Sequence, residues 1–356
     1  MATKITMKEI ARRVNVSVAT ASRVINQPHL VAEETRELVL AAMREHDYVY
    51  NAVAGSFSRK HSTTIGVIIP TTENQAFAST VMAIQAECMD HNYAVMVYSS
   101  HFDPEAEDRI LRQFLERQLE GVIITARDKS QSALARLLMG HGIACVFLWE
   151  VMKEPELSFV GFDNFQAGAR VAAHLLDLGH RRIGLMAGLF SKVDRVAHRV
   201  AGCRQAFEDR GLRWNPDLVL ELDPSLAAGR EGVKRLMKGP ARTRPTAVLT
   251  LSDTLALGAR AGLDDLGLRV PEDVSLSGFD GLELTAYTLP PLTTLHVPAE
   301  EIGRQAVRTL FNLIGNKDGG PIRLQLETEL VVRASTRAVE AAPEGRRKKM
   351  KQEERP

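Results

Sequence analysis

Three side chains near the start of the chain have the chemistry needed to contact the edges of DNA bases. Arg23 carries a guanidinium that can donate two hydrogen bonds to the O6 and N7 atoms of guanine, which is worth about 1–3 kcal/mol of discrimination. Val18 and Ala19 offer no hydrogen bonds, so they can only contact thymine methyl groups or exclude bulk. Because a helix in the major groove contacts bases near its N-terminus, these residues require an exposed helix that begins close to Val18.

The surrounding residues predict that helix, with another before it and a tight turn between the two. The first helix is indicated by apolar residues at helical spacing, Met7, Ile10, Ala11 and Val14. Ser17 can cap the second helix with its side-chain oxygen. The buried face of the second helix would comprise Ala21, Val24 and Ile25. A third helix over residues 33–45 would close the core with Thr35, Val39, Ala42 and Met43. This is the layout of a helix-turn-helix, although periodicity alone also allows a purely structural cap.

The distribution of charge favours DNA binding over a structural cap. Residues 1–30 contain five basic residues and one acidic residue, a net charge of +4, whereas the whole chain has a net charge of +1. A local surplus of this kind is what neutralisation of phosphates requires. We therefore expect duplex DNA as a partner, bound in a salt-dependent manner.

The length and composition of the chain indicate a larger body behind these helices. At 356 residues the chain exceeds the usual size of one domain, so at least two cores are expected. No apolar run approaches the length of a membrane span, and the polar start lacks the apolar region of a secretory signal, so we expect a cytoplasmic protein with no membrane contact. The spacing of Cys88, Cys145 and Cys203 fits neither a zinc site nor a disulfide framework and predicts reduced core thiols.

After residue 62, short apolar runs alternate with helical segments. The first strands are predicted at TIGVIIP, YAVMVYSS and LEGVIITA, and a second series, starting near Val160, includes RRIGLMAG, TAVLTLS and VSLSGFD. This alternation predicts two similar α/β lobes, each built on a doubly wound parallel sheet. Ligands of such sheets gather at the carboxyl ends of the strands.

The sequence gives no support for catalysis. Nucleotide-binding, P-loop, zinc-protease and hydrolase motifs are missing, and the ten histidines have no ligand spacing. We therefore expect no enzyme activity, no catalytic residue, no metal and no cofactor. The main alternative to a DNA-binding regulator is a small-molecule sensor without operator-specific repression, which the basic N-terminus disfavours.

Several segments resemble regulators of the lactose/galactose repressor (LacI/GalR) family. They are SVATASRVIN, VAEETRELVLAAM, NAVAGSFSRK, GHRRIG, RVAGC, LSDTLALGA, VPEDVSLSGFD and PPLTTL, and together they extend over roughly residues 3–338 in order. The resemblance implies an all-α helix-turn-helix head and a hinge helix. It also implies a core of two lobes like periplasmic sugar-binding proteins, with a ligand cleft between them.

The resemblance also implies domain boundaries. The head would occupy residues 1–50, the hinge 51–62, the core 63–339 and a disordered basic tail 340–356. Within the core, chain crossovers near residues 163 and 291 would divide an N-lobe from a C-lobe. The N-lobe would contain residues 63–162 and 292–325, and the C-lobe residues 163–291 and 326–339. Because one head covers only half a site and the tail has no leucine heptad, we expect a homodimer on a near-palindromic operator.

In the head and hinge, the resemblance assigns base preference to Val18, Ala19 and Arg23. Phosphate contacts are expected from four further residues, with helix capping or plain solvent exposure as alternatives: Ser17, Thr20, Ser22 and Asn26. In the hinge, Asn51, Ala54 and Phe57 are expected at the DNA, and Phe57 replaces the usual leucine wedge of the minor groove. Gly55 costs about 1 kcal/mol of helix propensity relative to alanine, so the hinge helix should form less readily without DNA. A plain flexible linker is the alternative.

The resemblance places six residues at the ligand cleft: Phe77, Trp149, Asp163, Arg199, Ser252 and Asp280. The segment GLFSKVDRVAHR brings Lys192 and Arg195 toward Arg199, although Arg195 could equally pair with Asp194. Arginine and carboxylates can hold vicinal hydroxyls while an aromatic face covers a sugar ring, with core packing of Phe77 and loop capping by Asp280 as alternatives. The predicted function is a repressor controlled by a sugar, sugar acid or sugar phosphate, and a nucleobase effector is the alternative.

Overall fold

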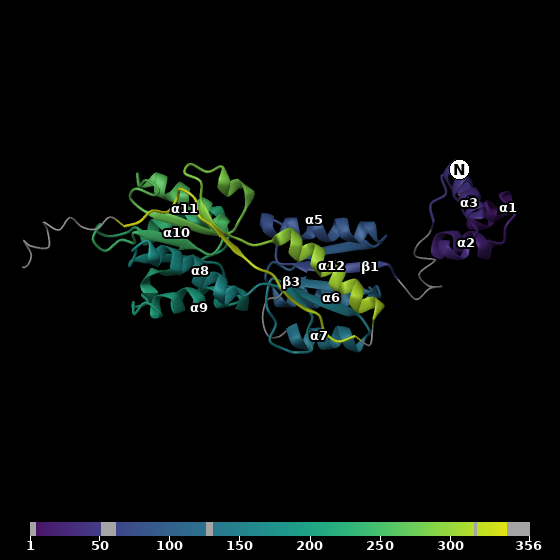
Figure 1. Cartoon of the computed structure of the whole chain (residues 1–356), viewed down its shortest axis with the longest axis horizontal. Helices are drawn as coiled ribbons and strands as arrows, with labels where there is room; N and C mark the ends of the chain where they lie inside the picture. Colours follow the sequence, from purple (N-terminus) through teal and green to yellow (C-terminus); the bar gives the residue numbers. More distant parts are fainter. Residues whose placement is uncertain (1–4, 51–61, 126–130, 317–318, 340–356) are drawn as a thin grey trace, which may run out of the picture. The chain divides into compact units, whose positions relative to one another are not determined.

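The structure is a computed structural model that describes residues 5–50, 62–125, 131–316 and 319–339 (Figure 1). The chain forms two compact units, of which the first ends at Ser62 and the second begins at Thr63. Three hinge residues predicted to contact DNA, Asn51, Ala54 and Phe57, lie outside the described residues, as do Gly55 and the tail.

In residues 5–50, the described part of the first unit apart from Ser62, the chain forms the three short α-helices that the sequence predicts. They are α1 (Met7–Arg13), α2 (Val18–Asn26) and α3 (Glu33–Glu45), with a 3-10 helix η1 (Pro28–Leu30) before α3. A capping box between Thr6 and Glu9 begins α1, and Ser17 begins α2 by accepting a hydrogen bond from the Thr20 N–H at 2.9 Å. The core of this unit is Ile10, Ala11, Ala21, Val24, Val39, Ala42 and Met43.

The second unit has two lobes, each with one twisted sheet. The N-lobe sheet has the strand order β11-β5-β4-β3-β1-β2. Its strands are β1 (Thr64–Ile69), β2 (Ala94–Ser99), β3 (Gly121–Thr125), β4 (Ala144–Leu148), β5 (Phe159–Gly161) and β11 (Arg323–Gln325). Its helices are α5 (Gln75–Asp90), α6 (Pro104–Glu116), α7 (Gln131–Gly140) and α12 (Ala299–Gly315). The central strands β1 and β3 are almost wholly buried and apolar because helices cover both faces of the sheet.

The C-lobe sheet has the strand order β12-β10-β9-β8-β6-β7. Its strands are β6 (Ile183–Ala187), β7 (Val219–Glu221), β8 (Ala247–Thr250), β9 (Ser275–Asp280), β10 (Thr293–His296) and β12 (Glu329–Val331). Its longer helices are α8 (Asn164–Asp177), α9 (Asp194–Glu208), α10 (Leu226–Leu236) and α11 (Asp253–Asp265). Two 3-10 helices, η2 (Pro216–Leu218) and η3 (Glu283–Ala286), lie in its loops. Figure 1 shows α8 and α9 on one side of the strands and α10 and α11 on the other. The parallel order is as predicted, apart from the antiparallel edge strand β12.

The described part of the second unit crosses between the lobes three times. The first crossover lies between β5 and α8, at the predicted position near residue 163. The second lies later than the predicted position near residue 291, because β10 pairs with β9 in the C-lobe and α12 packs against α5 in the N-lobe. The C-lobe therefore retains residues 292–296. The third crossover lies between β11 and β12.

No helix in the described part of the chain is long and apolar enough to cross a membrane. Cys88, Cys145 and Cys203 are buried free thiols, in agreement with the sequence prediction. Burial raises the pKa of each of the three thiols to about 12.

Candidate functional sites

Helix α2 presents the three predicted base-contacting residues on its exposed side. Val18 is 45% exposed although it is apolar, and Ala19 and Arg23 are also exposed. Ala21 and Val24 hold the opposite face of the helix in the core. The helix therefore has the two distinct faces that a recognition helix needs, one packed and one available to a partner.

The four predicted phosphate-contacting residues make local hydrogen bonds around α2. The Ser17 hydroxyl caps the helix and lies 2.8 Å from the Thr20 hydroxyl. The Asn26 amide nitrogen donates to the Ser22 hydroxyl at 3.0 Å and to the Tyr50 hydroxyl at 3.1 Å. Ser17 thus has the capping role that was one of its two interpretations, and Asn26 is held against the residue that precedes the hinge.

The core contains a cavity of about 600 Å³ between the two lobes. Six of the seven predicted effector residues line it: Phe77, Trp149, Arg195, Arg199, Ser252 and Asp280. Its C-lobe residues follow the carboxyl ends of β6, β7, β8 and β9, the position that doubly wound sheets favour for ligands. Its volume is in the range of small-molecule sites.

Asp163 does not line the cavity. Its carboxylate accepts a hydrogen bond from the Gln166 N–H at 2.9 Å and caps the start of α8. Lys192 is exposed and also lies outside the cavity lining. The helix-capping role of Asp163 follows from its position at the first crossover, where α8 begins at the next residue.

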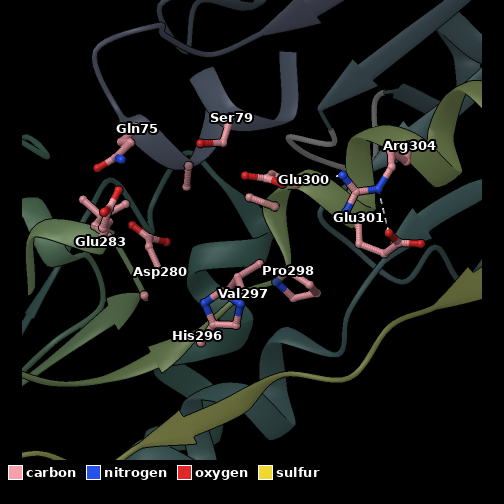
Figure 2. Close-up of a pocket in the computed structure, with 14 residues that line it drawn as sticks. Gln75, Ser79, Asp280, Glu283, His296, Val297, Pro298, Glu300, Glu301 and Arg304 are labelled. Carbon is pink, nitrogen blue, oxygen red and sulfur yellow. Dashed lines mark hydrogen bonds and ion pairs between the residues drawn. The ribbon is translucent and has the colours of Figure 1, made fainter. Parts of the chain in front are cut away.

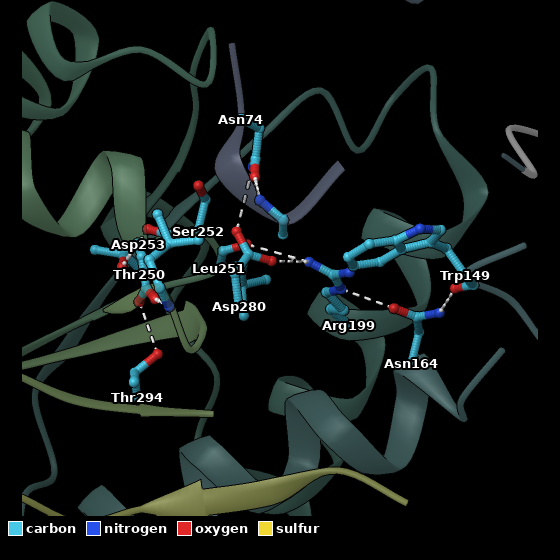
Figure 3. A network of polar contacts seen from close by, with 12 residues as sticks. Asn74, Trp149, Asn164, Arg199, Thr250, Leu251, Ser252, Asp253, Asp280 and Thr294 are labelled. Atoms are coloured by element: carbon cyan, nitrogen blue, oxygen red, sulfur yellow. Dashed lines mark hydrogen bonds and ion pairs between the residues drawn. The ribbon is translucent and has the colours of Figure 1, made fainter. Parts of the chain in front are cut away.

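A chain of polar contacts runs across the cavity from one lobe to the other and back (Figure 3). Asn74 of the N-lobe donates its side-chain amide to Asp280 of the C-lobe at 3.3 Å. The Asp280 carboxylate lies 4.0 Å from Nη1 of Arg199, which is also in the C-lobe. Nε of Arg199 donates to the Asn164 side chain at 2.7 Å, and Asn164 donates to the Trp149 carbonyl at 2.7 Å. Both ends of this chain belong to the N-lobe and its centre to the C-lobe. A change in the distance between the lobes would therefore lengthen or break contacts in this chain.

Packing of α8 against α9 positions Arg199 for these contacts. Gly168 on α8 has no side chain, and a Cβ there would collide with the carbonyl of Arg199. The guanidinium lies over the ring of Phe279, with its carbon 3.9 Å from the ring centroid, and is 5% exposed. Its Nη1 also donates to the Leu251 carbonyl at 3.3 Å. Arg199 is thus fixed on three sides and presents its remaining edge to the cavity.

Two buried carboxyl groups lie at the carboxyl end of β9. Burial, together with the charge of Asp280, raises the pKa of Asp253 to about 8, and burial raises the pKa of Asp280 to about 6. Arg199 and Asn74 limit the rise at Asp280. Asp253 is held in place by hydrogen bonds from the Thr294 hydroxyl at 2.7 Å and the Leu282 N–H at 2.8 Å. Asp280 itself has a φ of 114°, a sparsely populated conformation that is often found at binding sites.

Aromatic rings form the apolar side of the cavity. Phe77 and Trp149 meet edge to face with their centroids 4.9 Å apart, and Phe162 and Phe279 continue the row into the C-lobe. The Arg195 guanidinium lies 5.6 Å from the Phe77 centroid, so these two residues make a further contact between the lobes. Phe77 is therefore both packed in the core and part of the cavity wall.

Two polar atoms of the cavity lining are buried without a hydrogen-bond partner among the described residues. They are the indole Nε1 of Trp149 and the hydroxyl Oγ of Ser252. Burying such a group unpaired costs about 1–3 kcal/mol. A ligand that supplies an acceptor to the indole and a partner to the hydroxyl would recover this free energy on binding.

Sequence reasoning missed a second link between the lobes, close to the cavity. Glu150 follows Trp149 in the N-lobe, His198 precedes Arg199 in the C-lobe, and their side chains lie 3.1 Å apart. The hydrogen bond to Glu150 raises the pKa of His198, since the carboxylate favours the protonated ring. Neither residue belongs to a known motif, so only their adjacency to two predicted cavity residues could have suggested the pair.

We predict that His198→Gln weakens the dependence of stability on pH. Because the pKa of His198 is raised in the folded protein, the ion pair stabilises the fold fully below the ordinary value of 6.5 and is lost as the pH rises through the raised value. Chemical unfolding between about pH 6 and pH 8 should show a smaller loss of stability in the variant than in the parent chain. The raised pKa of Asp253 also lowers stability as the pH rises, but it does so in both proteins, so the test is the difference between their slopes. Equal slopes of stability against pH would contradict a contribution from His198.

A second, smaller cavity lies beside the crossover that follows β10 (Figure 2). It has a volume of about 420 Å³ and is lined by acidic residues of both lobes, Asp280, Glu283, Glu300 and Glu301. Arg304 pairs with Glu301 at 2.9 Å. Asp280 lines both cavities, so a ligand that displaces its carboxylate would also affect the crossover at Val297 and Pro298.

Two family models together match almost the whole described chain. Residues 6–51 match "Bacterial regulatory proteins, lacI family", and residues 62–333 match "Periplasmic binding proteins and sugar binding domain of LacI family". The chain belongs to the LacI family. The boundary between the two matches coincides with the boundary between the two structural units.

Similar proteins agree with this family membership. The HTH-type transcriptional repressor PurR of Aliivibrio fischeri is 32% identical over 331 residues, which cover 93% of this chain and 98% of that protein. The crystal structure of the Lac repressor dimer bound to operator and the anti-inducer ONPF has a TM-score of 0.81 at 30% identity, covering 94% of this chain and all of that one. A transcriptional regulator CelR–cellobiose complex has a TM-score of 0.68 at 27% identity, covering 93% and 99%.

The LacI-family chain is thus a DNA-binding transcriptional repressor with an effector-binding domain. The predicted fold is confirmed, with a helical helix-turn-helix unit followed by two α/β lobes like those of periplasmic binding proteins. The relatives described above are transcriptional regulators rather than enzymes.

Proposed function

We propose that this repressor binds a sugar-related effector in the 600 Å³ cavity and that the effector controls its affinity for a near-palindromic operator. The single observation that carries the proposal is the pair of unpartnered polar atoms, Trp149 Nε1 and Ser252 Oγ, in a cavity whose lining comes from both lobes. Unpaired buried polar groups lower the stability of the chain, and a ligand that completes their hydrogen bonds recovers that free energy on binding.

The contacts between the lobes supply the means of control. A ligand can act only by preferring one arrangement of the lobes over another. The Asn74–Asp280 hydrogen bond and the Glu150–His198 ion pair join the lobes beside the cavity, so they are the contacts that a ligand must preserve or break. Two similar structures support this proposal, since the transcriptional regulator CelR is in complex with cellobiose and the Lac repressor dimer is bound to operator and the anti-inducer ONPF.

A nucleobase effector is the second candidate. The edge-to-face pair of Phe77 and Trp149 offers an aromatic wall against which a planar ring could stack. Such a ligand would satisfy the Trp149 indole through a ring nitrogen or carbonyl. It would not need the two arginines of the cavity, which distinguishes it from an acidic sugar.

A ligand screen followed by operator titration tests the proposed function. Thermal unfolding of the purified full-length protein is measured with sugars, sugar acids, sugar phosphates and nucleobases, and each ligand that stabilises the protein is added to a titration with operator DNA. A change in operator affinity is the expected result. Binding of a ligand with no change in operator affinity would support a sensor without operator control. If the protein binds operator DNA no more tightly than a scrambled duplex, the role assigned to α2 is contradicted.

We further propose that the repressor is a homodimer. Helix α5 exposes Met82 and Met89, which are 69% and 72% exposed and lie two turns apart on one face of the helix. In the C-lobe, Tyr287 and Leu289 are 74% and 83% exposed. Exposed apolar side chains on one helix face, such as Met82 and Met89, are typical of an interface, and the similar Lac repressor structure is of a dimer.

The double change of Met82→Glu and Met89→Glu is therefore predicted to produce a monomer. Four carboxylates would face one another across the two-fold axis and prevent association. Light scattering should give half the mass, and operator affinity should fall about a hundredfold or more because the two heads no longer bind together. Leu137→Glu, an apolar-to-acidic change at a 45% exposed position on α7, is the control that should remain dimeric. A dimeric double variant would place the interface elsewhere.

A further inference from the structure

Three neighbouring strands of the N-lobe sheet begin at the same end, where the chain enters the second unit. Strand β1 lies between β3 and β2 and pairs in parallel with both. The residues that immediately precede these strands, Thr63, Tyr93 and Glu120, are therefore neighbours at the amino end of the sheet. Thr63 is also the first residue of the second unit, so it directly follows the predicted hinge, residues 51–62.

A hydrogen bond spans the start of β1 from one neighbouring strand to the other. The Tyr93 hydroxyl, on the β2 side, donates to Oε2 of Glu120, on the β3 side, at 2.8 Å. Neighbouring strands are about 4.8 Å apart, so only two long side chains can meet across the strand between them. Burial, together with the hydrogen bond and the charge of Glu120, raises the pKa of Tyr93, so the phenol remains a donor at neutral pH.

The same carboxylate holds the backbone of Thr63. Oε1 of Glu120 accepts a hydrogen bond from the Thr63 N–H at 2.6 Å, and the Thr63 carbonyl accepts one from the Ala94 N–H at 2.9 Å. Both backbone polar groups of Thr63 are thus engaged with the two neighbouring strands. We call Thr63, Tyr93 and Glu120 the strand-end clamp.

The conformation of Thr63 explains why such a clamp is needed. Its φ is 45°, in the left-handed region, which a β-branched residue seldom adopts. A strained conformation of this kind persists only where surrounding contacts hold it. The hydrogen bond from Thr63 to Glu120 is such a contact, and the backbone angle that it maintains sets the direction in which the chain enters β1.

The clamp also contacts the helix that follows the second crossover. The Tyr93 ring packs against the ring of Phe311 on α12, with the centroids 4.7 Å apart. Helix α12 begins at Ala299, which lines the smaller cavity beside the crossover, and Phe311 lies roughly 18 Å further along the helix. A single helix therefore extends from the crossover to the clamp.

We propose that Glu120 and Tyr93 are positioning residues for operator binding, and that they act by fixing the backbone of Thr63 at the end of the predicted hinge. A chain of fixed direction loses less conformational entropy when the head and hinge bind their site together. Binding to an arbitrary duplex depends mainly on phosphate contacts, which need no fixed direction. The clamp therefore contributes to operator affinity much more than to nonspecific affinity, whatever the class of the effector.

Titrations of purified full-length variants with DNA test the proposal. Fluorescence anisotropy compares a duplex that the parent protein selects from a random pool with a scrambled duplex of the same composition. Glu120→Ala removes both acceptor oxygens and should lower the ratio of the two affinities at least about tenfold, the effect expected for lost hydrogen bonds to a charged group. Tyr93→Phe, which keeps the ring against Phe311, should lower the ratio at least about threefold. Glu120→Gln retains an acceptor for the Thr63 N–H and should lose less than Glu120→Ala.

Tyr98→Phe is the matched control and should keep the ratio of the parent chain. Tyr98 lies near the other end of β2, its ring packs edge to face on Phe114, and its hydroxyl makes no hydrogen bond with the described residues. A loss of folded protein lowers both apparent affinities equally and leaves their ratio unchanged, so the ratio reports positioning rather than stability. An unchanged ratio in folded Glu120→Ala or in Tyr93→Phe would overturn the proposal, and Tyr93→Phe decides alone if Glu120→Ala fails to fold.

Discussion

Replacement of Arg23 by alanine is expected to remove most of the preference of the repressor for its operator over a scrambled duplex. Arg23 is the only side chain among the three exposed base-contacting candidates of α2 that can donate to a base edge, since Val18 and Ala19 are apolar. A bidentate contact with guanine discriminates by about 1–3 kcal/mol, so two heads on one operator would lose about 2–6 kcal/mol. Fluorescence anisotropy titrations with both duplexes at several salt concentrations measure the loss. Weak, salt-dependent binding should persist because Lys8, Arg12 and Arg13 remain.

Arg12→Ala is the matched control for this experiment. Arg12 is an exposed arginine of the same unit, but it lies on α1 rather than on the exposed face of α2. Its removal should weaken binding to both duplexes about equally and reduce the salt dependence, as expected for a phosphate contact. Equal discrimination by the Arg23→Ala protein and the parent chain would place base recognition on other residues.

The helices and strands could be predicted from the sequence because their signals are local. The apolar spacing of residues 7–45 predicted the three α-helices described in that range, and helix α3 begins and ends at the predicted residues. The buried strands of the lobes are short continuous apolar runs between helical segments. The second crossover could not be predicted in this way, because whether β10 continues the sheet of β9 depends on pairing between distant strands.

The cavity residues illustrate the same limit. Arg199 and Asp280 were found because the resemblance carries them, and the structure places both in the lining. Asp163 was assigned to the cleft by the same resemblance, but helix capping uses its carboxylate instead. Asn74 and Asn164 were missed, since an asparagine beside a helix start normally indicates a cap, and Asn74 does cap α5 with its oxygen while its nitrogen reaches Asp280. A side chain that serves both lobes cannot be recognised from one local pattern.

Arg199→Ala is expected to abolish the effector response and to leave operator binding intact at low temperature. Arg199 alone joins the Asn164 side chain, the Leu251 carbonyl and the Asp280 carboxylate, so its loss interrupts the polar chain between the lobes at its centre. It would also leave the buried Asp280 carboxylate without its ion-pair partner, beside the raised-pKa carboxyl of Asp253. The free energy of unfolding should therefore fall by about 3–5 kcal/mol, the usual cost of breaking a buried ion pair. Chemical unfolding measures this change, and operator titration with and without ligand measures the response.

Two further variants separate the effector response from stability. Arg204→Ala removes an arginine from the same helix, but Arg204 is 62% exposed and, among the residues that the structure describes, pairs only with Glu208. Stability and response should therefore both stay close to those of the parent chain. In Arg199→Ala/Asp280→Asn, the unpaired carboxylate is replaced by a neutral amide of the same shape. Because an amide is far less costly to bury than a charge, part of the lost stability should return. The effector response should not return, since the donors to the ligand are still missing. Recovery of the response together with stability would mean that Arg199 acts only by neutralising Asp280, and not as a ligand contact.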